Sequence, residues 1–205
     1  MTGPDPQETA DGVPRRRSDR PAFADPASIR LLVLDVDGVL TDGRITLDGA
    51  HPEPKTFHVR DGLAIRQWIT HGGRVAVVTG RSSPGVRARA AELGIDPVVQ
   101  GAGDKAEALA RVLAATGIPA AETAAMGDDL PDLPMLRAVG RPLAPADAVD
   151  EVRSAAAWTS ASPGGHGAVR EAIEHLMRAS GAWDAVVASF DRAPADEEEA
   201  HARIG

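Results

Sequence analysis

Ile29–Gly43, with the sequence IRLLVLDVDGVLTDG, is the stretch of this 205-residue chain that decides its fold. The apolar run Leu31–Leu34 favours a short strand that is buried on both faces. Asp35 and Asp37 follow it. Because alternate residues of a strand point to the same side, we expect both carboxylates at the carboxyl edge of a sheet, where open α/β sheets bind ligands. Two close carboxylates repel each other unless a cation lies between them, so the pair predicts a divalent metal that prefers oxygen ligands, Mg²⁺ first.

The rest of the chain repeats a strand, a polar loop and an amphipathic helix. Further strands are expected at residues 74–78, 97–99 and 122–126, and helices at residues 83–93, 104–116, 132–139 and 168–177, with short βα units over residues 143–158. Asp61 is expected to cap a helix that ends at Gly72-Gly73. This alternation predicts an α/β fold with a doubly wound, Rossmann-like parallel sheet.

A β-hairpin insertion is expected after the first strand. Residues 44–49 and 55–59 both alternate between apolar and polar side chains, and Asp48-Gly49 and two prolines lie between them. This pattern is typical of a hairpin with a longer loop.

The domain boundaries follow from composition. Residues 1–27 are rich in Pro, Gly, Asp and Arg without periodicity, which predicts a disordered N-terminal tail. Residues 28–180 form the expected single domain, and residues 181–205 form a C-terminal tail, partly helical and then disordered. The tail carries an apolar stripe, Trp183, Val186, Val187 and Phe190, which would pack either on its own core or on a neighbouring subunit.

Composition excludes several classes of function. The chain has no Cys, so disulfides and thiolate chemistry are excluded. A formal charge of −8, with three Phe, three Trp and no Tyr, argues against nucleic acid. No apolar run reaches the roughly 20 residues that span a bilayer, and Arg15-Arg16-Arg17 is followed by charges and prolines rather than the apolar segment of a twin-arginine signal. We therefore expect a soluble, cytoplasmic protein without a membrane partner.

Four polar clusters are expected at the carboxyl ends of successive strands or at the helix starts beside them: Asp35 with Asp37, Thr79-Gly80-Arg81, Lys105, and Asp128-Asp129. Each one alone is explained by a turn, a cap or a solvated charge. Together they supply what cleavage of a phosphate monoester requires. One carboxylate attacks phosphorus, a second acid protonates the leaving oxygen, and Mg²⁺, a lysine and a hydroxyl neutralise the phosphoryl oxygens.

These motifs carry a family resemblance. The sequence DVDGVLTDG, followed by Thr79-Gly80-Arg81, Lys105 and Gly127-Asp128-Asp129, resembles the haloacid dehalogenase-like phosphatase superfamily. Over residues 30–176 the chain is similar to the 3-deoxy-D-manno-octulosonate 8-phosphate phosphatase family. That finer match rests on residues 57–62, 65–66, 100–101, 132–134 and 164–171.

The resemblance implies a role for each matching position. Asp35 would be the nucleophile and a Mg²⁺ ligand, Asp37 the general acid/base with its backbone carbonyl on the metal, and Asp128 the remaining protein ligand. Thr79, Gly80 and Lys105 would bind phosphate. The implied substrate-binding residues are His58, Val59, Arg60, Asp61, Gly62, Arg66, Arg81 and Arg89. The resemblance also implies that there is no large cap domain, and that the protein forms a ring-like homotetramer in which the hairpin and the C-terminal segment reach a neighbour's active site.

The sequence therefore predicts a magnesium-dependent phosphatase acting on an acid-sugar phosphate, and it leaves alternatives open. Leu63-Ala64 departs from the family pattern, so a nonulosonate 9-phosphate or another sugar phosphate is a rival substrate. A catalytically idle oligomerisation module is a second rival. A phospho-acceptor receiver domain is disfavoured, because receivers carry the acceptor Asp on a later strand than their acidic pair.

Overall fold

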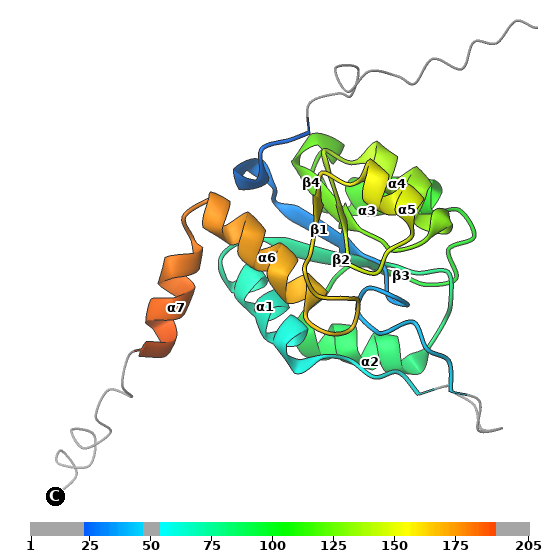
Figure 1. Ribbon diagram of the computed structural model, residues 1–205, viewed down its shortest axis with the longest axis horizontal. Coiled ribbons are helices and arrows are strands. Elements are labelled where there is room, and N and C mark those ends of the chain that lie inside the picture. The colour runs from blue at the N-terminus through cyan, green and yellow to red at the C-terminus, as the bar shows by residue number, and fades with distance from the viewer. Residues whose placement is uncertain (1–22, 47–53, 192–205) are drawn as a thin grey trace, which may run out of the picture.

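The computed structural model describes residues 23–46 and 54–191, which form an α/β fold around a six-stranded parallel sheet (Figure 1). The strands are β1 (Leu31–Leu34), β2 (Arg74–Val78), β3 (Val98–Val99), β4 (Thr123–Met126), β5 (Arg141–Ala144) and β6 (Trp158–Thr159). Their order is β3-β2-β1-β4-β5-β6. The chain builds outward from β1 to β3 and then returns to place β4 on the other side of β1. The strand order thus reverses between β1 and β4, the position at which such sheets bind ligands.

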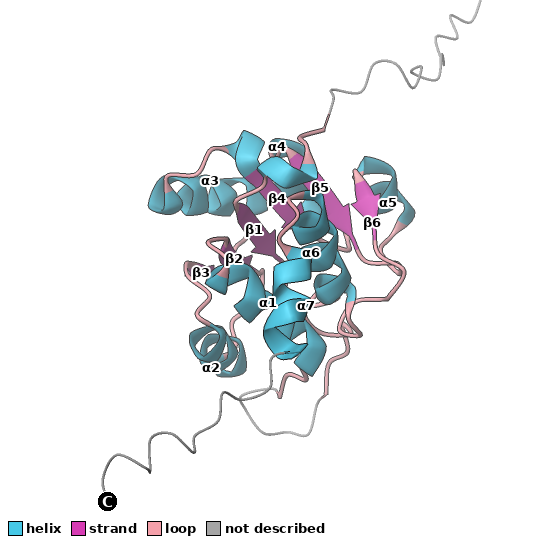
Figure 2. Cartoon of the chain, turned by 90° about the vertical axis from the view of Figure 1, so that its left-hand side faces the viewer, coloured by secondary structure: helices cyan, strands magenta, loops and turns pink. Residues whose placement is uncertain are grey.

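Helices cover both faces of the sheet, and Figure 2 shows the strands between the two sets. The helices on one face are α1 (Val59–Thr70), α2 (Pro84–Leu93) and α6 (Ala168–Ala179); those on the other are α3 (Lys105–Thr116), α4 (Leu133–Ala138) and α5 (Asp150–Ala155). The side chains of β1 alternate between the two cores: Leu32 and Leu34 join the first, and Leu31 and Val33 join the second. The predicted α/β fold with a parallel sheet is confirmed.

Local capping explains where α2 and α3 begin and end. Ser83 accepts a hydrogen bond from the Gly85 N–H at the start of α2, and Asp104 accepts from two N–H groups at the start of α3. Both helices end at a glycine in the left-handed conformation, Gly94 and Gly117.

Asp61 does not cap its own helix, so that prediction was wrong. Helix α1 already begins at Val59, and Asp61 lies buried in its first turn. Its carboxylate accepts a hydrogen bond from the Arg170 N–H, in the first turn of α6, at 2.7 Å. Because α1 and α6 pack side by side, Asp61 satisfies the amino end of the neighbouring helix instead.

The expected β-hairpin is not seen. Residues 44–46 and 54–58 form no strand, α1 follows directly, and residues 47–53 lie outside the described residues. The two segments were expected to pair with each other, and a two-stranded hairpin that no further strand or helix supports is marginally stable at best.

Both ends of the described chain contact the domain. The Ala24 N–H donates to the Gly140 carbonyl, and residues 26–28 form a 3₁₀ turn, so the folded part begins before the boundary expected at residue 28. Helix α7 (Trp183–Asp191) buries Trp183 and Val186 and leaves Val187 and Phe190 exposed. Among residues 23–46 and 54–191, no helix has the length and apolar composition needed to cross a bilayer.

Candidate active site

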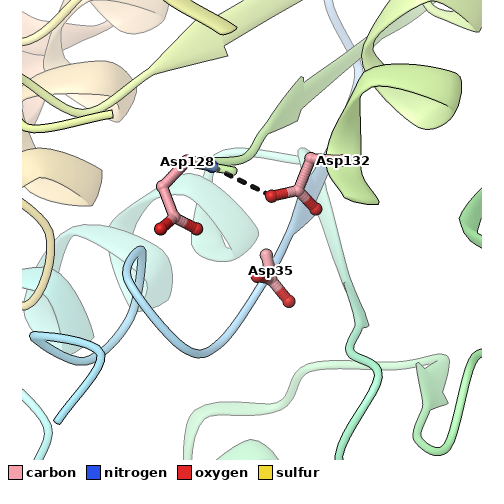
Figure 3. Close-up of side chains that lie close together, drawn as sticks. All are labelled: Asp35, Asp128 and Asp132. Atoms are coloured by element: carbon pink, nitrogen blue, oxygen red, sulfur yellow. Dashed lines mark hydrogen bonds between the residues drawn. The ribbon is translucent and has the colours of Figure 1, made fainter. Parts of the chain in front are cut away.

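Three carboxylates meet at the edge of the sheet where the strand order reverses. Asp35 directly follows β1 and extends its ladder, because its N–H donates to the Met126 carbonyl at 3.1 Å. Asp128 and Asp132 lie on the loop after β4. One oxygen from each of Asp35, Asp128 and Asp132 lies within 4.8 Å of the others (Figure 3). The topology therefore brings together residues that are almost 100 positions apart in the chain.

Asp132 organises the loop after β4. One of its oxygens accepts hydrogen bonds from the N–H groups of Asp128, at 3.0 Å, and Asp129, at 3.2 Å. Its other oxygen accepts from the Lys105 ammonium. The sequence predicted Asp132 as the start of a helix and as part of the family resemblance, but not as a site residue. The available signal was its position three residues after Asp129, the spacing of a capping box, which the structure contains.

Lys105 places a positive charge between two of the acids. It is the first residue of α3, its side chain is 7% exposed, and its Nζ lies 2.9 Å from Oδ1 of Asp35 and contacts Asp132. Burial disfavours the charged ammonium, but the carboxylates of Asp35 and Asp132 outweigh burial and raise the pKa of Lys105 above its usual value. Lys105 is therefore held as a cation.

One ammonium does not balance three acids. Burial, followed by the charge of Asp132, raises the pKa of Asp35 to about 6. Burial, followed by the charges of Asp132 and Asp35, raises the pKa of Asp128 to about 7. Oδ1 of Asp128 is also buried without a hydrogen-bond partner among the described residues. These residues fit a hard divalent cation such as Mg²⁺, which would pair with the unsatisfied oxygen and relieve the repulsion.

The Asp37 side chain does not join this cluster. Strand β1 ends at Leu34 and residues 37–40 form a turn, so the alternation expected to bring the Asp35 and Asp37 carboxylates together stops before both residues. The Asp37 carboxylate instead lies 2.5 Å from Nζ of Lys55 and 3.8 Å from Nε of Arg81. The expected arrangement, with one cation between the Asp35 and Asp37 carboxylates, is therefore not the one in the structure. Metal binding by the backbone carbonyl of Asp37 stays a prediction.

The expected phosphate-binding residues lie around the same pocket. Thr79, Gly80 and Arg81 follow β2, and they line the pocket together with Asp35, Asp37, Lys105 and the loop after β4. Thr79 is buried, and its backbone bridges β3 and the loop that leads to α3. The sheet thus collects the carboxylates, the ammonium and the hydroxyl at one edge.

Among the expected substrate-binding residues, only Arg81 lines this pocket. His58, Asp61, Gly62 and Arg89 surround a separate small cavity between α1 and α2, and Val59, Arg60 and Arg66 are exposed on α1. Arg89 forms an ion pair with Glu92 at 2.8 Å. Within the described chain these residues are not brought to the acidic pocket.

Close backbone contacts hold the turn that carries Asp37. Gly38 has a φ of +89°, and a Cβ at this position would collide with the Asp128 carboxylate. On the other side, a Cβ at Gly164 would collide with the Gly38 carbonyl, and the Gly165 N–H donates to the Val39 carbonyl at 2.9 Å. The glycine-rich loop before α6 therefore packs directly against the turn of residues 37–40.

Comparison with known proteins gives the family. A family model described as haloacid dehalogenase-like hydrolase matches residues 97–173. The 3-deoxy-D-manno-octulosonate 8-phosphate phosphatase KdsC of Haemophilus influenzae is 40% identical over 154 residues, which are 75% of this chain and 86% of that protein. This chain belongs to the 3-deoxy-D-manno-octulosonate 8-phosphate phosphatase family. KdsC of Escherichia coli K12 is 42% identical over 157 residues, 77% of this chain and 84% of that protein.

A solved structure of this family agrees with the fold and with the proposed class of metal. The 3-deoxy-D-manno-octulosonate 8-phosphate phosphatase of Moraxella catarrhalis, in complex with magnesium ion, phosphate ion and KDO, superimposes with a TM-score of 0.79 at 38% identity. The match covers 81% of this chain and 95% of that one. The resemblance stated from the sequence motifs is confirmed.

Proposed function

We propose that this protein is a magnesium-dependent phosphatase that hydrolyses 3-deoxy-D-manno-octulosonate 8-phosphate. The observation that carries the proposal is the convergence of Asp35, Asp128 and Asp132 around Lys105 at the switch point of the sheet. Membership of the family supports both the substrate and the metal.

In this proposal Asp35 and Asp37 carry out the two chemical steps. A carboxylate oxygen of Asp35 attacks phosphorus, the bond between phosphorus and the sugar oxygen breaks, and an aspartyl-phosphate forms. Asp37 gives a proton to the departing sugar oxygen. It then takes a proton from the water that attacks phosphorus, which releases inorganic phosphate and restores the Asp35 carboxylate.

The remaining groups stabilise charge on the phosphoryl oxygens. Lys105, the Thr79 hydroxyl and the N–H groups around Gly80 line the pocket and would donate to these oxygens. Asp35, Asp128 and the backbone carbonyl of Asp37 would hold Mg²⁺, with Asp132 fixing the loop. When bound, the metal neutralises charge on the nucleophile and on the transferring group.

Substrate recognition is proposed to depend on arginine side chains and on assembly of the protein into a homotetramer. Arg81 at the pocket rim suits the carboxylate of a sugar acid, since guanidinium binds carboxylate through two hydrogen bonds. Val59, Leu63, Val187 and Phe190 leave apolar side chains exposed, which supports the family's expected homotetramer. In such an assembly the other expected substrate-binding residues, including Arg60, Arg66 and Arg89, would act at a shared site; the mass in solution tests this.

The proposed function is tested by phosphate release with Mg²⁺ from a panel of sugar phosphates, with Asp35→Asn as the blank. Strong selectivity for octulosonate 8-phosphate supports the proposal. Selectivity for a nonulosonate 9-phosphate would keep the chemistry and change the substrate. No turnover of any phosphate ester would favour the idle oligomerisation module.

A further inference from the structure

Lys55 is a buried cation at the active site that the sequence motifs did not assign. It lies among residues 54–58, which form neither helix nor strand and lead directly into α1. We propose that Lys55 is a positioning residue, which holds the carboxylate of Asp37 in the orientation that the leaving-group oxygen requires. The inference rests on the proposed phosphatase function.

The burial of Lys55 makes its contact with Asp37 a strong constraint. The Lys55 side chain is 3% exposed, and its Nζ lies 2.5 Å from Oδ1 of Asp37. An ammonium withdrawn from water to this extent costs several kcal/mol unless a negative charge compensates it. The Asp37 carboxylate supplies such a charge at direct contact distance, so the ion pair holds the two side chains together.

Arg81, the second cation near Asp37, is a weaker constraint. Its Nε lies 3.8 Å from the other carboxylate oxygen, and its side chain is 51% exposed. Solvent screens a pair of this kind. Of the two contacts, the one with Lys55 is therefore the stronger constraint on how the Asp37 carboxylate is turned.

Lys55 contacts Asp37 but does not itself line the acidic pocket. The described residues that line the acidic pocket include Asp37 and Arg81 but not Lys55. Its effect on the reaction therefore passes through Asp37 rather than through contact with the substrate.

The orientation of Asp37 matters because of the role proposed for it. The torsion that turns an aspartate carboxylate is broad, so an unrestrained group samples many orientations. A general acid must lie within hydrogen-bond reach of the oxygen that it protonates. With Oδ1 held by Lys55, the other oxygen, Oδ2, lies 3.8 Å from Nε of Arg81, which lines the pocket together with Asp37.

The test compares two aryl phosphates that differ in how much they need an acid. The phenolate that leaves from phenyl phosphate is the more basic and depends more on protonation by the general acid. The p-nitrophenolate that leaves from p-nitrophenyl phosphate needs little protonation. Neither substrate requires recognition of a sugar. We expect Lys55→Met to lower kcat on phenyl phosphate by about 10- to 100-fold and on p-nitrophenyl phosphate by less than about three-fold, with KM unchanged. Lys55→Arg, which keeps the charge, should recover most of the loss.

A double-mutant cycle separates positioning from an independent role. In the Asp37→Asn background, Lys55→Met should change kcat by less than about two-fold, because the group through which Lys55 acts is already removed. If Lys55→Met lowered kcat by the same factor with and without Asp37→Asn, the two residues would act independently and the proposal would be overturned. A raised KM with unchanged kcat for Lys55→Met would also overturn it and would make Lys55 a substrate-binding residue.

Two controls keep the result interpretable. Where Lys55→Met alone fails to fold, Lys55→Gln supplies the same comparison, and the double variant removes both charges of the pair together. If the wild-type protein released phosphate in Mg²⁺ from neither the aryl phosphates nor octulosonate 8-phosphate, the phosphatase function itself would fail, and the role of Lys55 with it. Wild-type turnover combined with an equal loss on both aryl phosphates for Lys55→Met would refute the positioning role alone.

Discussion

Lys105→Met should destabilise the protein in a way that Mg²⁺ partly reverses. The substitution keeps most of the volume of the side chain and removes the ammonium from between Asp35 and Asp132. These side chains are 8% and 1% exposed, so water cannot replace the lost cation. Breaking a buried ion pair by removing one partner costs about 3–5 kcal/mol. We expect the low end, about 3 kcal/mol, because burial has already raised the pKa of Asp35 to about 6 and a proton partly relieves the site.

The assay is urea unfolding of wild type and Lys105→Met, each in EDTA and in saturating Mg²⁺. In EDTA the variant should lose about 3 kcal/mol in the free energy of unfolding. In Mg²⁺ the difference should shrink, because a ligand present at roughly 100 times its dissociation constant stabilises the folded state by about 2.7 kcal/mol, and the variant's unpaired acids bind it more tightly.

A matched control exists on the surface. Arg30 pairs with Glu122 at 3.0 Å, but their side chains are 65% and 36% exposed. Arg30→Met should therefore cost less than about 1 kcal/mol and should not respond to Mg²⁺. If Lys105→Met were as stable in EDTA as Arg30→Met, or if Mg²⁺ stabilised it no more than wild type, the electrostatic account of the acidic cluster would be refuted.

Three further predictions concern other parts of the fold. Asp61→Ala leaves the Arg170 N–H of α6 without its acceptor and should lower the free energy of unfolding by about 1–2 kcal/mol; an unchanged urea midpoint would contradict this. Gly164→Ala forces a Cβ against the Gly38 carbonyl and should cost about 1–3 kcal/mol and reduce kcat, whereas Gly103→Ala, which meets open space, should be stable. Burial, followed by the charge of Arg141, lowers the pKa of His175, so the unfolded chain takes up a proton near pH 6.5 before the folded protein does. The contribution of His175 should therefore lower stability as the pH drops below about 6.5, whereas the raised pKa values of Asp35 and Asp128 act in the opposite direction over this range. His175→Gln should therefore gain stability relative to wild type as the pH falls, and parallel profiles of the two proteins would count against this.

The sheet and its helices were predictable because each element is encoded locally. A parallel strand is buried on both faces, so β1 and β2 read as continuous apolar runs. The ends of α2 and α3 are marked by Ser83 and Asp104 at the start and by glycines at the end. Once the strands are parallel, the carboxyl-edge position of Asp35 and Asp128 follows from topology.

The parts that were not predictable depend on contacts between distant segments. The hairpin was inferred from alternation alone, but a two-stranded hairpin is stable only when further strands or a helix pack against it, which alternation does not show. Asp61 looked like a local cap because its partner, the amino end of α6, lies more than 100 residues away. Lys55 belongs to none of the polar clusters that the sequence marked as catalytic. Its proposed role depends on the contact that the segment before α1 makes with Asp37, 18 residues earlier in the chain.

The most direct test of the central claim is to trap the phosphoenzyme at Asp35. Borohydride added during turnover of octulosonate 8-phosphate with Mg²⁺ reduces an aspartyl-phosphate to homoserine, which peptide mass spectrometry locates. We expect homoserine at position 35, and none there in Asp35→Asn or without substrate. Turnover with no reduced residue at position 35, or with the reduced residue at Asp37 or Asp128, would contradict the assignment of Asp35 as the nucleophile.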